Sequence, residues 1–207
     1  MKEYEKIQTI FQRDMGAKSR LLIEGAWSHP AFEYLKNNQW VFTEKIDGTN
    51  IRVIYTGSDV IYKGKTEEAQ IPATLVKRLM DILPASRFGD LPPLTLYSEG
   101  YGKNIQTGGN YIRDGVNLIL FDVWIDGWWL ERENIEDVAS KLELSVVPII
   151  GTGTLMEGYE ITRAGFPSGI ADCQAEGLVM RPCVTLHDRK GERIIAKIKH
   201  KDFKNIR

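Results

Sequence analysis

The segment TEKIDGTN, residues 43–50, constrains the fold more than any other part of the chain. Apolar and polar side chains alternate over residues 41–46 and again over residues 51–55, which is typical of β-strands with one buried face. Asp47 and Gly48, which separate the two runs, are turn-forming residue types. The sequence therefore predicts two strands joined by a turn, with Lys45 at the tip of the first strand.

The length and composition favour one domain. With 207 residues and 43% hydrophobic composition, the chain can bury one good core but not the cores of two ordinary domains. We predict a single domain over residues 1–207, with no separate C-terminal domain. The 27 basic and 28 acidic residues give a net charge of −1, which excludes a polycation but allows a local basic groove.

Two isolated cysteines, Cys173 and Cys183, favour reduced thiols rather than a disulfide framework, and the three histidines lack metal-ligand spacing. The N-terminus is too charged for a signal peptide, and no window holds the roughly 18 apolar residues of a membrane span. We expect a monomer in the cytoplasm, or in the host cytoplasm if the protein is viral.

The remaining patterns predict an α+β fold with largely antiparallel β-sheets and flanking helices. Alternation or continuous apolar runs predict strands at residues 60–63, 94–98, 116–125, 177–181 and 193–199. Helical spacing predicts helices after Pro30 and Pro72, over residues 132–142, and after Thr154. Thr154 and Glu157 fit a capping box, and Gly165 is well placed to end that helix.

The strand predicted near the C-terminal end, RIIAKIK, has two different faces. Alternation places Ile194, Ala196 and Ile198 on one face and Lys197 and Lys199 on the other. A solvated sheet face is the simpler interpretation. Two ammonium groups aimed the same way from a half-buried strand also form an anion clamp suited to a triphosphate.

Lys45 is a candidate nucleophile, because an amine at a strand tip beside a turn can attack a phosphoanhydride. Such chemistry also needs groups that bind a metal, a sugar and a base. Glu99 and Glu176 lie at predicted strand ends, where a carboxylate can hold Mg²⁺ or accept ribose hydroxyls. Phe121, within LILFDVW, is either a core residue or a stacking platform for a base.

Five stretches in order, EKIDGTN, SEGYG, LFDV, EGLVMR and AKIK, resemble the collinear nucleotidyltransferase motifs of polynucleotide ligases and capping enzymes. The resemblance runs from about Trp40 to Lys199, and five motifs in order are highly specific although each alone is weak. It implies an ATP-grasp-like ligase adenylation fold with the nucleotide held between sheets. The asparagine after KIDGT, the FDV strand and KIKHKDF are most similar to RNA ligases of the phage and RNA-editing type, and closest to small phage RNA ligases.

The resemblance also implies roles for single residues. Lys45 would form a covalent lysyl-AMP, and Lys197 and Lys199 would bind the ATP α-phosphate and assist the departure of pyrophosphate. Glu176 would act beside the catalytic Mg²⁺ or Mn²⁺. Neighbouring cations and the metal would favour the neutral, nucleophilic amine.

Six further residues would contact the nucleotide or the metal hydration shell: Thr43, Glu44, Asn50, Arg52, Glu99 and Phe121. The two residues before Lys45 would read adenine, and Asn50 and Arg52 would contact phosphate and the metal-bound waters. The glutamate would bind the ribose, and the phenylalanine would sandwich adenine.

The implied activity is ATP-dependent RNA ligation, as in RNA repair. AMP would pass from the lysine to a 5′-phosphate end of RNA, and a 3′-hydroxyl, in a single strand or a nicked duplex, would displace it. Three alternatives stay open: an ATP-dependent DNA ligase, a GTP-using capping nucleotidyltransferase, and a non-catalytic nucleotide- or RNA-binding module.

Many relatives carry a further C-terminal domain that helps to bind nucleic acid, whereas this sequence ends a few residues after AKIK. Its tail, KHKDFKNIR, is strongly basic. With Lys103 and Arg113, the tail is either a minimal phosphate-tracking surface or a solubilising end.

Overall fold

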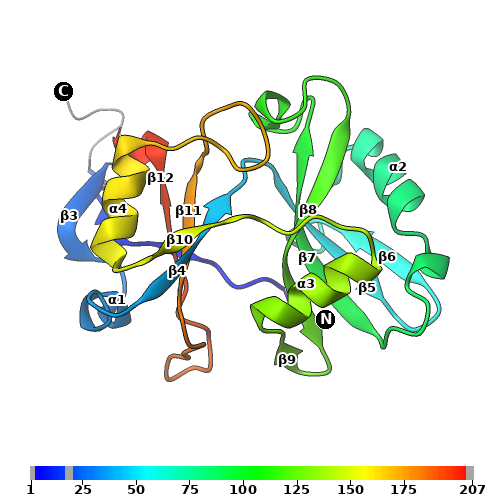
Figure 1. Ribbon diagram of the computed structural model, residues 1–207, viewed down its shortest axis with the longest axis horizontal. Coiled ribbons are helices and arrows are strands. Elements are labelled where there is room, and N and C mark those ends of the chain that lie inside the picture. The colour runs from blue at the N-terminus through cyan, green and yellow to red at the C-terminus, as the bar shows by residue number, and fades with distance from the viewer. Residues whose placement is uncertain (1–2, 17–20, 204–207) are drawn as a thin grey trace. The chain divides into compact units, whose positions relative to one another are not determined.

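The computed structural model describes residues 3–16 and 21–203, so the end of the basic tail lies outside the described residues. The chain folds into two compact units. Unit 1 comprises Met1–Tyr4 and Ile46–Val147, and unit 2 comprises Glu5–Lys45 and Pro148–Arg207. Each unit has a β-sheet of its own (Figure 1). Each also has its own cluster of buried hydrophobic side chains. The prediction of a single adenylyltransferase domain stays a prediction.

Unit 1 is built on a five-stranded antiparallel sheet in the order β6-β5-β7-β8-β9. Its strands are β5 (Thr49–Tyr55), β6 (Val60–Lys63), β7 (Leu94–Gly102), β8 (Val116–Ile125) and β9 (Trp128–Trp129). Its helices are α2 (Ala73–Ile82), α3 (Arg132–Lys141) and the short 3-10 turns η1 (Ala85–Arg87) and η2 (Gly108–Asn110). Because β7 continues to Gly102, Glu99 lies within this strand and not at its end as predicted.

The two faces of the unit 1 sheet differ because side chains alternate along each strand. Ile51, Val53 and Leu96 are fully buried and belong to the hydrophobic cluster that α2 covers. Leu75 of α2 packs so closely that a Cβ atom on Gly100 would lie 2.4 Å from its Cδ2 atom. The opposite face of the sheet carries Asn50, Arg52 and Glu99.

Unit 2 contains a second five-stranded sheet in the order β1-β12-β11-β4-β10, in which β1 runs parallel to β12 and the other neighbours are antiparallel. Its strands are β1 (Gln8–Thr9), β4 (Trp40–Lys45), β10 (Ile149–Gly153), β11 (Gly177–Pro182) and β12 (Ala196–Lys199). A hairpin of β2 (Phe11–Arg13) and β3 (Leu22–Trp27) is separate from this sheet. The helices are α1 (Pro30–Tyr34), α4 (Leu155–Ala164) and the 3-10 turn η3 (His200–Phe203).

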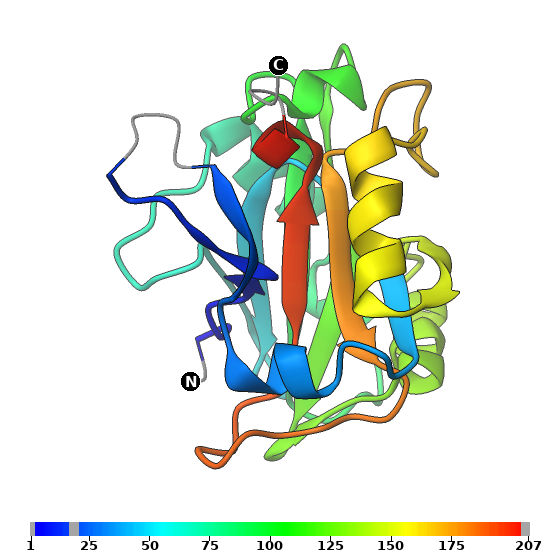
Figure 2. The same ribbon diagram turned by 90° about the vertical axis from the view of Figure 1, so that its left-hand side faces the viewer.

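Helix α4 lies alongside β11 (Figure 2). The predicted capping box is present, since the Glu157 N–H donates to Thr154 Oγ1 and the Thr154 N–H donates to Glu157 Oε2. Gly165 ends the helix with a φ of 80°, in the region that favours glycine. A Cβ atom on Gly158 would lie 2.5 Å from Met180 Sδ, so the absence of a side chain lets α4 pack directly on β11.

The predicted α+β class with largely antiparallel sheets is confirmed. Sequence patterns missed β1, β2 and β3 in the first forty residues, and they missed β10, whose pairing with β4 shifts register between Ile149 and Gly151. The predicted helix after Pro30 is short and ends at Tyr34. No helix in the described part of the chain has the length and apolar character needed to cross a membrane.

Candidate active site

The predicted site residues fall into two groups, one in each unit. Unit 2 holds Thr43, Glu44, Lys45, Glu176, Lys197 and Lys199. Unit 1 holds Asn50, Arg52, Glu99 and Phe121.

Three charged side chains of unit 2 meet where β4 and β12 end and β11 begins. Lys45 Nζ lies 2.6 Å from Glu176 Oε2, and Lys199 Nζ lies 2.5 Å from Glu176 Oε1. The Glu176 side chain is only 8% exposed, so water screens these ion pairs weakly. With both lysines protonated, the three groups carry a net charge of +1. They are electrically balanced when one lysine loses its proton.

The strand register brings this cluster together. Gly177 of β11 pairs with both Lys45 and Lys199, so the two lysine side chains lie on the same face of the sheet. A Cβ atom on Gly177 would lie 2.1 Å from Ile198 O, so only glycine allows the strands to approach this closely here. Glu176 immediately precedes β11 and therefore reaches both lysines.

Thr43 and Lys197 lie two residues further along the same face. Both pair with Val179 of β11, and Thr43 Oγ1 donates to Val179 O at 3.1 Å. The register thus places Lys197 and Lys199 on one face, as the alternation in RIIAKIK predicted.

Glu44 points to the opposite face from Lys45, as a neighbouring strand residue does. It is 1% exposed, and its Oε2 accepts the Gly169 N–H at 2.8 Å. Its Oε1 is buried without a hydrogen-bond partner among the described residues. Burial raises the pKa of the Cys173 thiol, and the negative charge of Glu44 adds to this shift. The role of Glu44 in reading adenine stays a prediction.

In unit 1, Asn50, Arg52 and Glu99 share the polar face of the sheet. Asn50 pairs with Glu99, and Arg52 is two residues further along β5. Arg52 is fully buried, with Nε donating to Gly64 O at 2.9 Å and Nη2 donating to Glu67 Oε1 at 3.0 Å. Its guanidinium therefore holds the loop after β6, and its predicted contact with phosphate stays a prediction.

Phe121 lies at an irregularity of the sheet. Tyr97 of β7 pairs with Asp122 of β8, whereas Ser98 pairs with Leu120. Phe121 is therefore the extra residue of a β-bulge, a feature that often re-aims a side chain beside an active site.

Sequence reasoning missed the residues that hold the turn at Asp47. Thr107 Oγ1 donates to Asp47 Oδ2, and the Asp47 N–H donates to the Tyr111 hydroxyl at 3.4 Å. A Cβ atom on Gly48 would lie 2.2 Å from Gly100 O, so this position also requires glycine. Thr107 and Tyr111 come from the glycine-rich loop after β7, whose composition indicates a loop but not what it contacts.

Glu176 is the predicted metal residue. Across residues 3–16 and 21–203, no three His, Cys, Asp or Glu side chains gather into a metal-binding cluster. Both oxygens of Glu176 face lysine ammonium groups, Oε1 that of Lys199 and Oε2 that of Lys45. Mg²⁺ commonly takes one or two carboxylates and completes its shell with water and substrate phosphates, so a carboxylate such as Glu176 fits it if the metal displaces one of these ion pairs.

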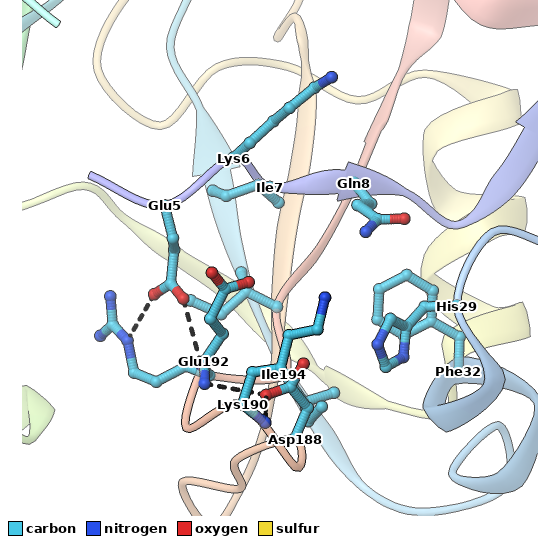
Figure 3. A pocket seen from close by; sticks show the side chains of 12 residues that line it. Glu5, Lys6, Ile7, Gln8, His29, Phe32, Asp188, Lys190, Glu192 and Ile194 are labelled. Carbon is cyan, nitrogen blue, oxygen red and sulfur yellow. Dashed lines mark hydrogen bonds and ion pairs between the residues drawn. The ribbon is translucent and has the colours of Figure 1, made fainter. Parts of the chain in front are cut away.

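A separate polar pocket of about 190 Å³ lies in unit 2. Figure 3 shows the side chains that line it. Arg193 Nε donates to Glu5 Oε1 at 2.8 Å in its wall, and His29 and Asp188 also line it. The Glu192 N–H donates to the Asp188 carboxylate and is the main cause that lowers its pKa. None of the predicted site residues lines this pocket.

The fold is similar to that of solved RNA ligases from Naegleria gruberi. A mutant in its apo form aligns with a TM-score of 0.64 and 18% identity, covering 97% of this chain and 58% of that chain. A mutant with ATP and Mn aligns with a TM-score of 0.63 and 17% identity, covering 98% and 64%, respectively. A mutant with AMP and Mn aligns with a TM-score of 0.63 and 20% identity, covering 82% and 52%. This chain thus spans less than two thirds of the length of each of these ligases.

The sequence itself defines the family. Residues 38–199 match the RNA ligase family, so the chain belongs to that family. No curated protein sequence gives a significant match. The family-level resemblance of the five motifs is confirmed, whereas the closeness to small phage RNA ligases stays a prediction.

Proposed function

We propose that this chain is an ATP-dependent RNA ligase that works through a lysyl-AMP intermediate at Lys45. The observation that carries the proposal is the position of the Lys45 amine, 2.6 Å from a carboxylate that Lys199 also contacts. Membership of the RNA ligase family supports it. Structures of the Naegleria gruberi RNA ligase that contain ATP or AMP with Mn support the choice of nucleotide and metal.

In the first step, the neutral amine of Lys45 attacks the α-phosphorus of ATP. A P–N bond forms, the bond from the α-phosphorus to the bridging oxygen breaks, pyrophosphate leaves, and the nitrogen releases one proton as the phosphoramidate forms. The neutral amine is compatible with the cluster because Lys199 and Glu176 then balance each other. Lys197 and Lys199, on the same face, would stabilise the charge on the α-phosphate and the leaving group.

In the next two steps, AMP passes to a 5′-phosphate end of RNA, and a 3′-hydroxyl then displaces AMP. Each is an in-line phosphoryl transfer, so positioning and electrostatic stabilisation supply most of the catalysis. Mg²⁺ or Mn²⁺ held through Glu176 would supply positive charge at the phosphates. We assign nucleotide contacts to Thr43, Glu44, Asn50, Arg52, Glu99 and Phe121.

The test is covalent labelling with α-labelled ATP in the presence of Mg²⁺ or Mn²⁺. The label should stay on the protein, and both Lys45→Ala and Lys45→Arg should abolish it, because the arginine keeps the charge but is not a nucleophile. Lys141→Ala is the matched control, since Lys141 Nζ also lies 2.6 Å from a carboxylate, that of Asp137. Persistent labelling of both Lys45 variants would disprove the assignment.

The acceptor needs its own assay. Nicked duplexes and single strands with RNA or DNA at the 3′-hydroxyl side should be sealed only where the 3′-hydroxyl strand is RNA. Labelling with GTP in place of ATP would support a capping enzyme. RNA binding without any labelling would support a non-catalytic module.

A further inference from the structure

Tyr4 is a buried aromatic residue beside the proposed adenine platform. It is 7% exposed and lies in unit 1 with Phe121. The two ring centroids are 5.1 Å apart, and the rings meet at 81°, an edge-to-face geometry. Such contacts are favourable because the positive edge of one ring faces the negative face of the other.

The hydroxyl end of Tyr4 is fixed as well. Its Oη atom donates to Asp122 Oδ2 at 2.8 Å, and the Asp122 side chain is fully buried. The Tyr4 ring also contacts Tyr97 at 5.1 Å and Trp129 at 5.4 Å. Packing on several sides and a hydrogen bond to a buried carboxylate leave this ring little freedom to move.

Phe121 needs such a neighbour because it is the extra residue of the β-bulge. The regular ladder does not dictate where a bulged side chain points, so its packing contacts must do so. A T-shaped contact covers at most one face of a ring. Tyr4 can therefore fix the plane of Phe121 and still leave a face for a stacked base.

We propose that Tyr4 is a positioning residue that holds the Phe121 ring in the orientation needed to stack on the adenine of ATP, with the Asp122 carboxylate as its anchor. The inference rests on the proposed function, because it assumes that Phe121 binds the base. Tyr4 acts through Phe121 and does not contact the nucleotide in this scheme.

The test is the dependence of lysyl-AMP formation on ATP concentration in Tyr4 variants. Tyr4→Leu should raise the KM for ATP roughly threefold to tenfold and change kcat little. This range corresponds to the free energy that an edge-to-face aromatic pair contributes. Tyr4→Phe keeps the ring but loses the hydrogen bond to Asp122, so it should raise the KM for ATP less than Tyr4→Leu does and leave it above the wild-type value. The matched control is Tyr55→Leu, because Tyr55 is 6% exposed, stacks on Phe88 and donates its hydroxyl to Gly57 O. This control should lower stability without raising the KM for ATP.

A double-mutant cycle separates positioning from a general loss of structure. In the Phe121→Leu background, Tyr4→Leu should raise the KM for ATP less than twofold, because the platform is already gone. Independent effects of the two substitutions would overturn the inference, as would an unchanged KM in Tyr4→Leu. If the wild-type protein is never labelled, the proposed function fails instead, so the two failures are distinguishable.

Discussion

The carboxylate of Glu176 lies 2.6 Å from the amine of Lys45, and its other oxygen pairs with Lys199. Glu176→Gln keeps the shape of the side chain but removes the carboxylate that pairs with both lysines and that we propose as the metal ligand. We expect the rate of lysyl-AMP formation to fall about tenfold or more, since a hydrogen bond to a charged group is worth about 1.5–3 kcal/mol. Single-turnover labelling with α-labelled ATP measures this rate.

Glu160→Gln is the control for that substitution. Glu160 forms an exposed ion pair with Arg163 at 3.7 Å in the same unit, and such pairs contribute little. Its labelling rate should match the wild type. A wild-type rate in Glu176→Gln would show that the carboxylate is not needed for the first step.

The cluster was predictable because it depends on regular strands. Alternation in RIIAKIK placed Lys197 and Lys199 on one face, and the turn signal after Lys45 placed the amine at a strand end. What brings Lys45 and Lys199 to one carboxylate is their common pairing with Gly177, which requires the strand order. Only the resemblance to ligases supplied that information before the structure.

Other contacts were not predictable because they join distant or irregular segments. Tyr4 and Asp122 are 118 positions apart, and Thr107 and Asp47 are 60 positions apart, so no local period marks either pair. The bulge at Phe121 lies inside a continuous apolar run, where alternation carries no signal. Short strands such as β1, with two residues, are below the length at which a period can be recognised.

Thr107→Val should slow lysyl-AMP formation severalfold. The valine keeps the shape of the side chain but removes the hydrogen bond from Thr107 Oγ1 to Asp47 Oδ2, which is worth about 0.5–1.5 kcal/mol. The turn that follows Lys45 then loses one of its fixed contacts. Labelling kinetics and a urea melt of the same preparation separate a change in rate from a change in stability.

The control for the turn is Thr56→Val. Thr56 Oγ1 donates to Asp59 O at 3.2 Å and accepts the Asp59 N–H at 3.0 Å in another turn of unit 1, so the substitution removes at least as many side-chain hydrogen bonds. It should leave the labelling rate unchanged. Equal slowing by both substitutions would mean that the Asp47 turn has no special part in the reaction.

Arg52→Lys should lower the free energy of unfolding by about 1–3 kcal/mol. Lysine cannot reproduce the two-pronged contact of the guanidinium with Gly64 O and Glu67, so a buried carbonyl loses its donor. Urea denaturation measures this loss. The midpoint concentration should fall, while the slope of the unfolding free energy against urea concentration stays the same.

Arg132→Lys tests whether burial matters to that result. Arg132 also contacts one carboxylate and one carbonyl, those of Glu136 and Val147, but its side chain is 31% exposed. We expect a smaller loss there, because water can replace the missing donor. An unchanged unfolding free energy in Arg52→Lys would contradict the role of Arg52 in holding the loop. The labelling rate of the same variant tests the separate assignment of a nucleotide contact to Arg52.

Ionisation of Tyr159 should lower the free energy of unfolding at high pH. Burial, with the nearby charge of Glu24, raises the pKa of Tyr159 from 10.0 to about 12. The unfolded chain therefore ionises first, so the stabilisation is complete below pH 10 and is lost as the pH rises through about 12. Over this window the unfolding free energy should fall by at most about 1.4 kcal/mol per pH unit through this group.

The measurement is the difference in unfolding free energy between wild type and Tyr159→Phe at pH 9 and at pH 11. Other groups that titrate in this range contribute to both proteins and cancel in the difference. The advantage of the wild type should shrink between the two pH values, because only its Tyr159 can ionise. Tyr34→Phe is the control, since Tyr34 is 87% exposed and its difference from wild type should not change with pH. A pH-independent difference for Tyr159→Phe would mean that the hydroxyl near Glu24 ionises as readily in the folded protein as in the unfolded chain.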